Sequence, residues 1–201
     1  MLRITGGEFR GRSIQAPTHD RTRPTQAKLR QALFNSLQAS IPDAKVLDLF
    51  AGSGALGFEA LSRGAAEVIF VETSKAALKV IQKNAAVLGV EDRVTLIEAT
   101  LSQNATGHSH LAAIQKQVPF DLVLADPPYS GGWESWLITE LPWAQWLSPD
   151  GFFCLEWGTQ KSKINSLPDQ LPFLVKTREK NYGDSMLTTY RRSDLSREDL
   201  T

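Results

Sequence analysis

The chain has 201 residues, of which 42% are hydrophobic and 22% are charged. These values are ordinary for a soluble globular protein, and no apolar run has the length of a membrane span. The first residues, MLRITGGEFRGRS, lack the apolar core of a secretory signal, so we expect a cytoplasmic protein. A chain of this length predicts one well-buried core with a small appendage.

The formal net charge of zero hides a segregation of charge along the chain. Residues 1–30 carry seven Lys or Arg against two acids, and residues 161–192 carry seven against three. The middle, 31–160, has seven more acids than bases. Two basic stretches on an acidic body fit a polyanionic partner, and they fit a solvated surface equally well.

Residues that bind metals or form disulfides are few. The single cysteine, Cys154, lies in the apolar run GFFCLEW and is expected to pack in the core. The three histidines, His19, His108 and His110, offer one close pair without a cysteine or an obvious carboxylate beside it. We therefore expect no metal site.

The first forty residues differ in pattern from the rest. LRIT and RSIQA flank a segment with a Gly-Gly turn and predict a small β-hairpin, and TQAKLRQALFNSL predicts a helix. From residue 44 onward, short apolar runs alternate with segments of helical spacing. The predicted strands are 44–50, 67–72, 93–99, 120–126 and 151–157. The predicted helices are 55–64, 74–89 and 133–141, with a weak helical signal in 101–118 and a resumption in WAQWL.

Two further strands, roughly 173–180 and 185–192, flank the turn signal NYGD and predict an antiparallel hairpin. Strands that alternate with helices predict a parallel sheet covered on both faces. The fold class is therefore α/β, a doubly wound, mostly parallel seven-stranded sheet of the Rossmann-like type, with the hairpin added at one end. We expect residues 1–40 to be a basic appendage, 41–192 the main domain, and 193–201 a disordered polar tail.

A glycine loop, Gly52-x-Gly54-x-x-Gly57, follows the strand at 44–50 and opens the next helix. Glycines there allow close approach of a ligand, and the free amides of a helix start favour an anionic group. Glu72 stands twenty residues after Gly52 at the end of the next strand, where a carboxylate can accept both ribose hydroxyls of a nucleoside. The pattern favours a nucleoside-like ligand over a purely structural turn.

Asp48 bears on which nucleoside-like ligand this is. NAD and S-adenosylmethionine are both bound by a glycine loop and a ribose-binding acid. Asp48 lies four residues before Gly52, where it can hydrogen-bond the loop or meet an ammonium group. S-adenosylmethionine carries such an ammonium and a pyrophosphate does not, although Asp48 alone does not decide between the two ligands.

The strand at 120–126 runs into an unusual sequence, FDLVLADPPYSGG. Proline lacks the amide hydrogen that a central strand needs, so the two prolines end the strand. The same residues can also form a rigid cup for a flat substrate. Ligands of doubly wound sheets bind beyond the carboxyl ends of the strands near the topological switch, so we expect Asp126 and Tyr129 to face Gly52 across it.

DPPY after a strand is a motif of methyltransferases that act on exocyclic amines of nucleobases. It occurs here together with RPTQAKLRQALFNSL (23–37), DLFAGSGALGFEALSRGA (48–65) and KNYGDSMLTTYRR (180–192). With these stretches the chain resembles the bacterial small-subunit rRNA guanine-N2 methyltransferases, the RsmD family. The resemblance covers nearly the whole chain, from RITGGEFRGR onward.

The resemblance implies transfer of a methyl group from S-adenosylmethionine to the N2 of one guanine in 16S rRNA, with S-adenosylhomocysteine as the product and no metal. We expect 16S rRNA within a small-subunit assembly particle as the partner, no membrane, and a monomer. The choice between naked rRNA and an assembled particle, and the oligomeric state, stay open. Which guanine is methylated stays open.

The resemblance also implies three groups of site residues. The transfer residues are Asp126, Pro127, Pro128 and Tyr129. The cofactor-binding residues are Asp48, Phe50, Ala51, Gly52, Ser53, Gly54, Glu72, Thr73 and Ala99. The RNA-binding residues are Arg10, Arg12, Arg21, Arg23 and Thr25.

The transfer residues suit the chemistry of a guanine amine. Its lone pair is delocalised into the ring, so Asp126 and the carbonyl of Pro127 would accept its two N–H groups and orient the nitrogen. Tyr129 would stack on the extruded base. Asp126 as a general base is the alternative role.

Three rival functions remain. An adenine-N6 DNA methyltransferase or another RNA amino-methyltransferase would share DPPY. A nicotinamide oxidoreductase would share the glycine loop and Glu72, and a ribosome assembly factor without catalysis would share the fold.

Overall fold

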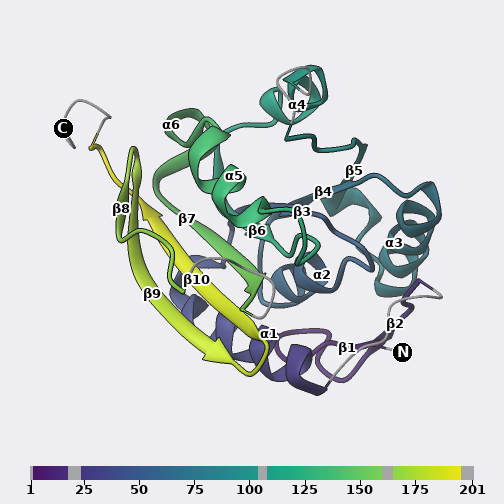
Figure 1. The fold of residues 1–201 in the computed structure, drawn as a ribbon. Coiled ribbons are helices and arrows are strands. Elements are labelled where there is room, and N and C mark those ends of the chain that lie inside the picture. The colour runs from purple at the N-terminus through teal and green to yellow at the C-terminus, as the bar shows by residue number, and fades with distance from the viewer. Residues whose placement is uncertain (1, 18–23, 104–107, 160–164, 196–201) are drawn as a thin grey trace. The chain divides into compact units, whose positions relative to one another are not determined.

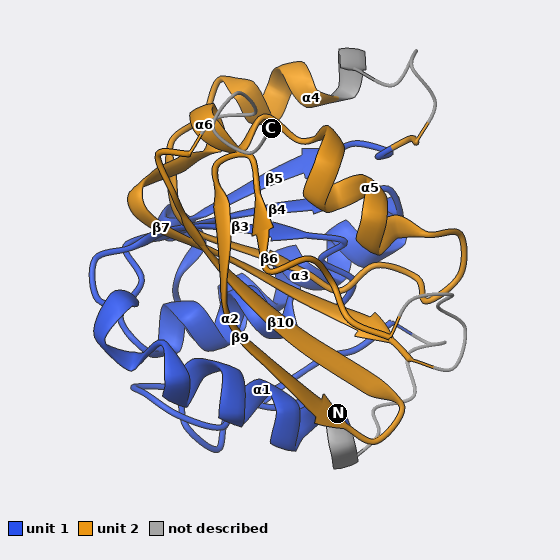
Figure 2. Ribbon diagram, turned by 60° about the vertical axis from the view of Figure 1, so that its left-hand side comes forward, with its two compact units in different colours: residues 1–101 blue, residues 102–201 orange. Residues whose placement is uncertain are grey.

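The computed structural model describes residues 2–17, 24–103, 108–159 and 165–195 (Figure 1). The chain divides into two compact units, residues 1–101 and residues 102–201 (Figure 2), and each unit is described by itself. This division does not test the expected boundaries at residues 40 and 192, which stay a prediction. Most of the expected polar tail, residues 196–201, lies outside the described residues. No described helix has the length and apolar character needed to span a membrane.

Unit 1 begins with the predicted hairpin and helix, which are both confirmed. The elements are β1 (Leu2–Arg3), β2 (Ser13–Ile14), α1 (Pro24–Ser36) and a 3-10 turn, η1 (Gln38–Ser40). β1 and β2 pair antiparallel over two residues each. In α1, Leu29, Leu33 and Phe34 are fully buried, because residues three and four apart share one face of a helix.

The rest of unit 1 is a parallel three-stranded arrangement in the order β5–β4–β3. Its elements are β3 (Lys45–Leu49), α2 (Ala55–Ser62), β4 (Glu67–Glu72), α3 (Lys75–Leu88), η2 (Glu91–Arg93) and β5 (Val94–Glu98). All three strands and both helices are confirmed to within two residues at each end. α2 packs against β3 and β4, and α3 packs against β4 and β5.

The ends of α3 show why its bounds could be predicted. The hydroxyl of Ser74 accepts the amide of Ala77 at 3.3 Å, which satisfies one free donor of the first turn. Gly89 ends the helix with φ 73°, a left-handed conformation that glycine adopts without strain. The predicted helix, 74–89, begins and ends at these two residues.

Unit 2 has five strands in the order β6–β7–β10–β9–β8. Its elements are α4 (His108–Gln115), β6 (Phe120–Ala125), α5 (Trp133–Glu140), α6 (Trp143–Trp146), β7 (Leu147–Gly158), β8 (Gln170–Leu171), β9 (Leu174–Tyr182) and β10 (Ser185–Arg192). β6 and β7 pair in parallel, and the later pairs are antiparallel. The α/β class with a parallel core and an antiparallel C-terminal hairpin is thus confirmed.

Two details of unit 2 differ from the prediction. Apart from the N-terminal hairpin, the described part of the chain has three strands in unit 1 and five in unit 2. The total of eight is one more than the expected seven, because β8 pairs with the start of β9. A strand of two residues has no alternation that a sequence pattern can detect. β7 also begins at Leu147, four residues earlier than predicted, since the segment SPDG resembles a turn.

The tryptophans of unit 2 fall into two groups. Trp143 and Trp146 are buried in the core, where the Trp143 ring contacts Phe153 and the Trp146 ring contacts Phe120. Trp133 is only half-buried, at the start of α5. Cys154 is buried as predicted, and burial raises the pKa of its thiol to about 12.

Candidate active site

The loop between β3 and α2 turns on residues with positive φ. Phe50 has φ 59°, Gly52 has φ 53° and Gly54 has φ 77°. A positive φ at Phe50 is a strained conformation for a residue with a side chain, and such strain concentrates at ligand sites. A Cβ on Gly52 would meet nothing closer than the Phe50 carbonyl oxygen at 3.9 Å, so the space beside this backbone is open.

Gly57 serves packing rather than the loop itself. A Cβ built on Gly57 would lie 2.2 Å from the ring of Phe70, a distance that no real contact reaches. The missing side chain therefore lets α2 lie close against β4, which is the usual role of the third glycine in such a motif.

Glu72, at the end of β4, holds the loop in place. Its Oε2 accepts the amide of Gly52 at 2.8 Å, and its Oε1 accepts the amide of Ser74 at 2.8 Å. Each carboxylate oxygen can accept a second hydrogen bond, so Glu72 retains acceptors for ribose hydroxyls. The ribose contact stays a prediction, and the bond to Gly52 explains how the acid and the loop act as one unit.

Asp48 lies below the loop and is 1% exposed. Its Oδ2 accepts the amide of Gly57 at 2.9 Å, so one of its two expected roles, a hydrogen bond to the loop and helix start, is confirmed. Burial raises the pKa of Asp48 to about 8; the bond from Gly57 lowers it and the charge of Glu72 raises it. A cationic ammonium would relieve that burial penalty, because an opposite charge favours the ionised form.

The remaining predicted cofactor residues also belong to unit 1. All of them follow the carboxyl ends of β3, β4 or β5, three adjacent parallel strands. Ala51, Ser53 and Ala99 are buried, and Thr73 is exposed. The amide of Ala99 donates to the carbonyl of Glu72 at 3.2 Å. These features fit an adenosine-like cofactor with an ammonium group. They are the open backbone of Gly52, the spare acceptors of Glu72 and the buried carboxyl of Asp48.

The DPPY motif belongs to unit 2 and follows β6 directly. Asp126 is half-buried, Pro127 is buried and Pro128 is exposed. Asp126 stands close enough to Tyr129 for its charge to act on the phenol. The expectation that these residues face Gly52 across the switch stays a prediction.

Tyr129 is fixed by neighbours on two strands. Its hydroxyl donates to Glu156 Oε1 of β7 at 2.5 Å and lies 2.8 Å from the hydroxyl of Ser185 of β10. A Cβ on Gly158 would lie 2.5 Å from the Tyr129 ring, so the ring rests directly on the backbone of β7. Burial, with the charges of Asp126 and Glu156, raises the pKa of Tyr129 far above its usual value. The phenol therefore stays neutral and remains a hydrogen-bond donor.

The predicted RNA-binding residues have different surroundings. Arg10 is exposed, and the described part of the chain gives its side chain no ion pair or hydrogen bond. Arg12 instead donates to the carbonyls of Val87 and Leu88 at the end of α3. Thr25 belongs to α1, while Arg21 and Arg23 lie outside the described residues. Arg12 thus has a structural task that Arg10 lacks.

The loop of the N-terminal hairpin is anchored to α2 by a fully buried acid. Glu59 accepts the amide and the hydroxyl of Thr5 at 2.8 and 2.7 Å. It also pairs with Arg30 of α1 at 3.3 Å and with Arg63 at 2.8 Å. A Cβ on Gly7 would lie 1.7 Å from a backbone oxygen of α2, so glycine is needed at this position for the close approach.

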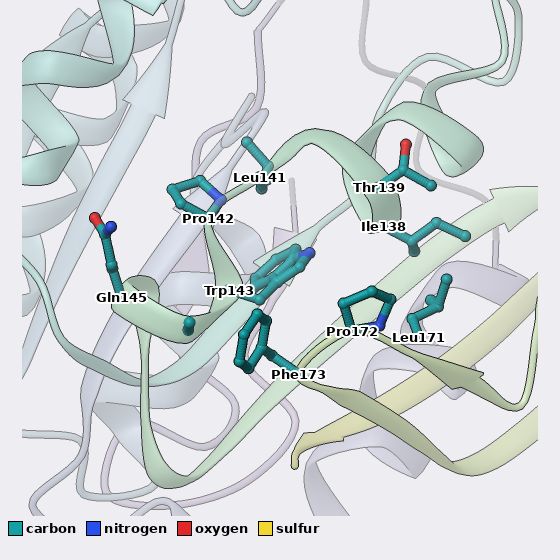
Figure 3. A pocket seen from close by; sticks show the side chains of 10 residues that line it. Ile138, Thr139, Leu141, Pro142, Trp143, Gln145, Leu171, Pro172 and Phe173 are labelled. Carbon is teal, nitrogen blue, oxygen red and sulfur yellow. The ribbon is translucent and has the colours of Figure 1, made fainter. Parts of the chain in front are cut away.

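A cavity elsewhere in unit 2 is separate from these residues. It has a volume of about 470 Å³ and is lined by side chains of α5 and α6 and of the segment before β9 (Figure 3). Its lining is mainly apolar, including Ile138, Trp143 and Phe173, and contains no residue of DPPY. It lacks the charged groups that nucleobase chemistry requires.

Comparison with known proteins identifies the family. Residues 2–191 match the model of the family described as "Conserved hypothetical protein 95". The chain is 35% identical over 198 residues to Ribosomal RNA small subunit methyltransferase D of Escherichia coli (strain K12), an alignment of 98% of this chain and 93% of that protein. The chain belongs to the RsmD family.

Other RsmD-family matches agree in length and fold. The Haemophilus influenzae protein of the same name is 34% identical over 190 residues, 94% of this chain and 92% of its own. The Escherichia coli structure named "Putative methyltransferase yhhF" superposes with a TM-score of 0.80 at 35% identity, and the match covers 96% of this chain and 98% of that one. The methyltransferase fold expected from the sequence is therefore confirmed.

Sequence reasoning missed three supporting residues of this RsmD-family chain. They are Glu156, Gly158 and Ser185, which together hold Tyr129. The sequence did contain one indication that Glu156 belongs to the site. Glu156 is the single acid in the apolar run GFFCLEW, just as Asp126 ends the apolar run of β6. Glu59 had no such signal for its anchoring role, since two of its partners, Thr5 and Arg30, are distant in sequence.

Proposed function

We propose that this protein transfers a methyl group from S-adenosylmethionine to the exocyclic N2 of a guanine in 16S rRNA. The observation that carries the proposal is DPPY placed directly after β6, with Tyr129 held rigidly by Glu156 and Ser185. Relatives named as small-subunit rRNA methyltransferases support rRNA as the substrate. The choice of guanine N2 comes from the resemblance in sequence described above.

The residues around the glycine loop would hold the cofactor, which supplies a methyl group on a positively charged sulfur. Glu72 would accept ribose hydroxyls through its remaining lone pairs while it fixes the Gly52 amide. Asp48 would receive the ammonium group. A bound cation there would favour the ionised carboxylate and lower the raised pKa of Asp48.

Asp126 would prepare the amine for attack. Its carboxylate and the Pro127 carbonyl would accept the two N–H bonds, which turns the nitrogen lone pair out of the ring system. As the amine takes the methyl group from the sulfur, Asp126 would stabilise the positive charge that develops on nitrogen. The methylated amine releases one proton to complete the reaction, so Asp126 need not act as a base.

Tyr129 would contribute a preorganised surface for the extruded base. Its ring cannot rotate freely, because Gly158 lies under it and its hydroxyl is hydrogen-bonded at 2.5 and 2.8 Å. A fixed ring costs little entropy when a base stacks on it. Arg10 on the N-terminal hairpin would contact phosphates. The proposal includes a small-subunit particle as substrate, the cytoplasm as compartment and a monomeric enzyme.

The test of this function is to incubate labelled S-adenosylmethionine with small-subunit particles and with free 16S rRNA. The methylated nucleoside is then identified by mass spectrometry, and we expect N2-methylguanosine. N6-methyladenosine would support the adenine-specific rival and overturn the guanine assignment. RNA binding without label transfer would favour a non-catalytic assembly factor.

A thermal-shift measurement separates the cofactors. S-adenosylhomocysteine should raise the melting temperature and NAD should leave it unchanged, whereas a shift with NAD alone would favour an oxidoreductase. Asp126→Ala should keep the S-adenosylhomocysteine shift but lower kcat on the order of a hundredfold or more. Asp150→Ala is the matched control, because Asp150 is an exposed acid that pairs only with Arg191 in the described chain. Full activity of Asp126→Ala would contradict the proposed role.

A further inference from the structure

Three side chains on β9 are not used by the proposed function. Arg178, Lys180 and Tyr182 are alternate residues of this strand, so their side chains emerge on the same face. Arg178 and Lys180 are exposed, and Tyr182 is half-buried. The Lys180 ammonium lies 5.4 Å from the centre of the Tyr182 ring, which agrees with a shared face.

Strand register shows that this face also carries Tyr129. Ser185 of β10 lies opposite Gly158 of β7 and opposite Tyr182 of β9. Residues directly opposite each other point to the same side of a sheet. Tyr129 rests on Gly158 and hydrogen-bonds Ser185, so it lies on that side as well. Tyr182 therefore emerges two strands away from Gly158, a separation of about 10 Å.

The two cations continue along the strand from Tyr182. Lys180 lies opposite Leu187, and Arg178 lies opposite Thr189, both on β10 and both buried. Arg178 and Tyr182 are separated by about 13 Å along β9. Arg178, Lys180 and Tyr182 thus form a strip of two exposed cations and one half-buried aromatic ring on this face of β9.

The acid in the middle of β9 points to the opposite face. Glu179 accepts the hydroxyl of Thr188 at 2.8 Å and pairs with Lys176 at 3.5 Å. Partial burial raises the pKa of Glu179, but the hydrogen bonds from Ser166 and Thr188 and the charge of Lys176 outweigh it and lower the pKa. Glu179 is therefore ionised, and these partners occupy its carboxylate. In the described part of the chain no acid forms an ion pair with Arg178 or Lys180. The positive charge of the strip is therefore available to a ligand.

We infer that Arg178, Lys180 and Tyr182 bind the RNA segment that flanks the target nucleotide. The cations would contact phosphates, and a flanking base would stack on Tyr182. Single-stranded RNA is bound in this way, by cationic surfaces with aromatic rings on which bases stack. The strip lies on the face of Tyr129, where the target base would be held, so flanking nucleotides can reach it. This inference rests on the proposed function.

The experiment measures RNA affinity at several salt concentrations, and kcat and KM for methylation, with free 16S rRNA or an assembly particle as the probe. Arg178→Ala/Lys180→Ala should reduce the salt slope of binding by about 1.4, because each phosphate contact on a single strand contributes about 0.7. Tyr182→Ala should weaken binding at least about fivefold, and Tyr182→Phe should retain the affinity because the ring remains. In both weakened variants KM should rise while kcat stays near that of the parent.

Lys79→Ala/Lys83→Ala is the matched control, since both lysines are exposed on α3 and the change in net charge is the same. The control should match the parent in salt slope and KM. The S-adenosylhomocysteine thermal shift should be unchanged in every variant, which shows that the fold is intact.

The outcomes separate this inference from the function on which it rests. A parent protein that methylates no RNA overturns both. A parent that methylates RNA, together with β9 variants that keep its KM and salt slope, overturns the inference alone. The same result would assign the strip to solvent or to a partner protein. Equal losses in the β9 variants and in the α3 control would show a general charge effect and would also overturn it.

Discussion

Asp48 links the stability of the protein to pH. Its pKa is about 8 in the folded chain, against an ordinary value of 3.8. Between about pH 4 and pH 8, Asp48 is protonated in the folded protein and ionised in the unfolded chain. Its contribution to the free energy of unfolding is therefore fully present below about pH 4, and it is lost as pH rises through 8. From pH 5 to pH 7 this single group lowers the free energy of unfolding by about 1.4 kcal/mol per pH unit.

Asp48→Asn removes this titration, because its amide oxygen can still accept the Gly57 amide but cannot ionise. We expect the free energy of unfolding of the parent to fall more steeply between pH 5 and pH 7 than that of the variant. Urea denaturation of both proteins at three pH values measures the difference. Parallel curves would show that Asp48 is already ionised in the folded chain.

Glu59 connects three elements of unit 1, namely the hairpin loop, α1 and α2. Its side chain is 0% exposed and accepts hydrogen bonds from Thr5, Arg30 and Arg63. Arg30 also donates to the carbonyl of Arg3 at 2.8 Å. The position of the hairpin, and with it of Arg10, therefore depends on one acid in the middle of α2.

Glu59→Gln should lower the free energy of unfolding by about 3 kcal/mol or more, because it leaves buried Arg30 without its counter-charge. Glu67→Gln is the control, since Glu67 pairs with Lys45 at 3.2 Å but is 44% exposed. An exposed pair contributes less than about 1 kcal/mol. Chemical denaturation of the two variants and the parent gives the comparison, and similar small losses in both would contradict the anchoring role of Glu59.

The regular elements were predictable where local patterns determine them. β4 was predicted at its observed bounds because EVIFVE is a complete apolar strand between turn residues, and α3 carries its own caps, Ser74 and Gly89. β8 was missed because its two residues gain their pairing from β9 and not from a pattern of their own. The same contrast between local patterns and strand pairing applies to the residues of the site. Asp126 and Glu72 stand at strand ends that the sequence marks, whereas the support of Tyr129 by Ser185 requires strand register.

The charges of the whole molecule show the limit of a sequence count. Residues 1–30 and 161–192 are both basic, yet the structure gives several of these cations partners within the chain. Arg191 pairs with Asp150, and Arg12 caps the end of α3. Arg10 is exposed without such a partner in the described chain. These partners lie far away in sequence, so only the fold distinguishes the cations available to RNA.

Variants of Arg10 and Arg12 test this distinction, because each substitution changes the net charge of the molecule by the same amount. Arg10→Ala should weaken RNA binding and reduce its salt slope by about 0.7, because one phosphate contact is lost. Arg12→Ala should keep the parent slope but lower the free energy of unfolding by about 1 kcal/mol, because the carbonyls of Val87 and Leu88 lose a donor. Binding titrations in a salt series and urea denaturation measure the two effects. Both variants change the charge of the molecule by one unit, so an equal fall in slope would mean that the overall field, and not the position of Arg10, attracts the RNA.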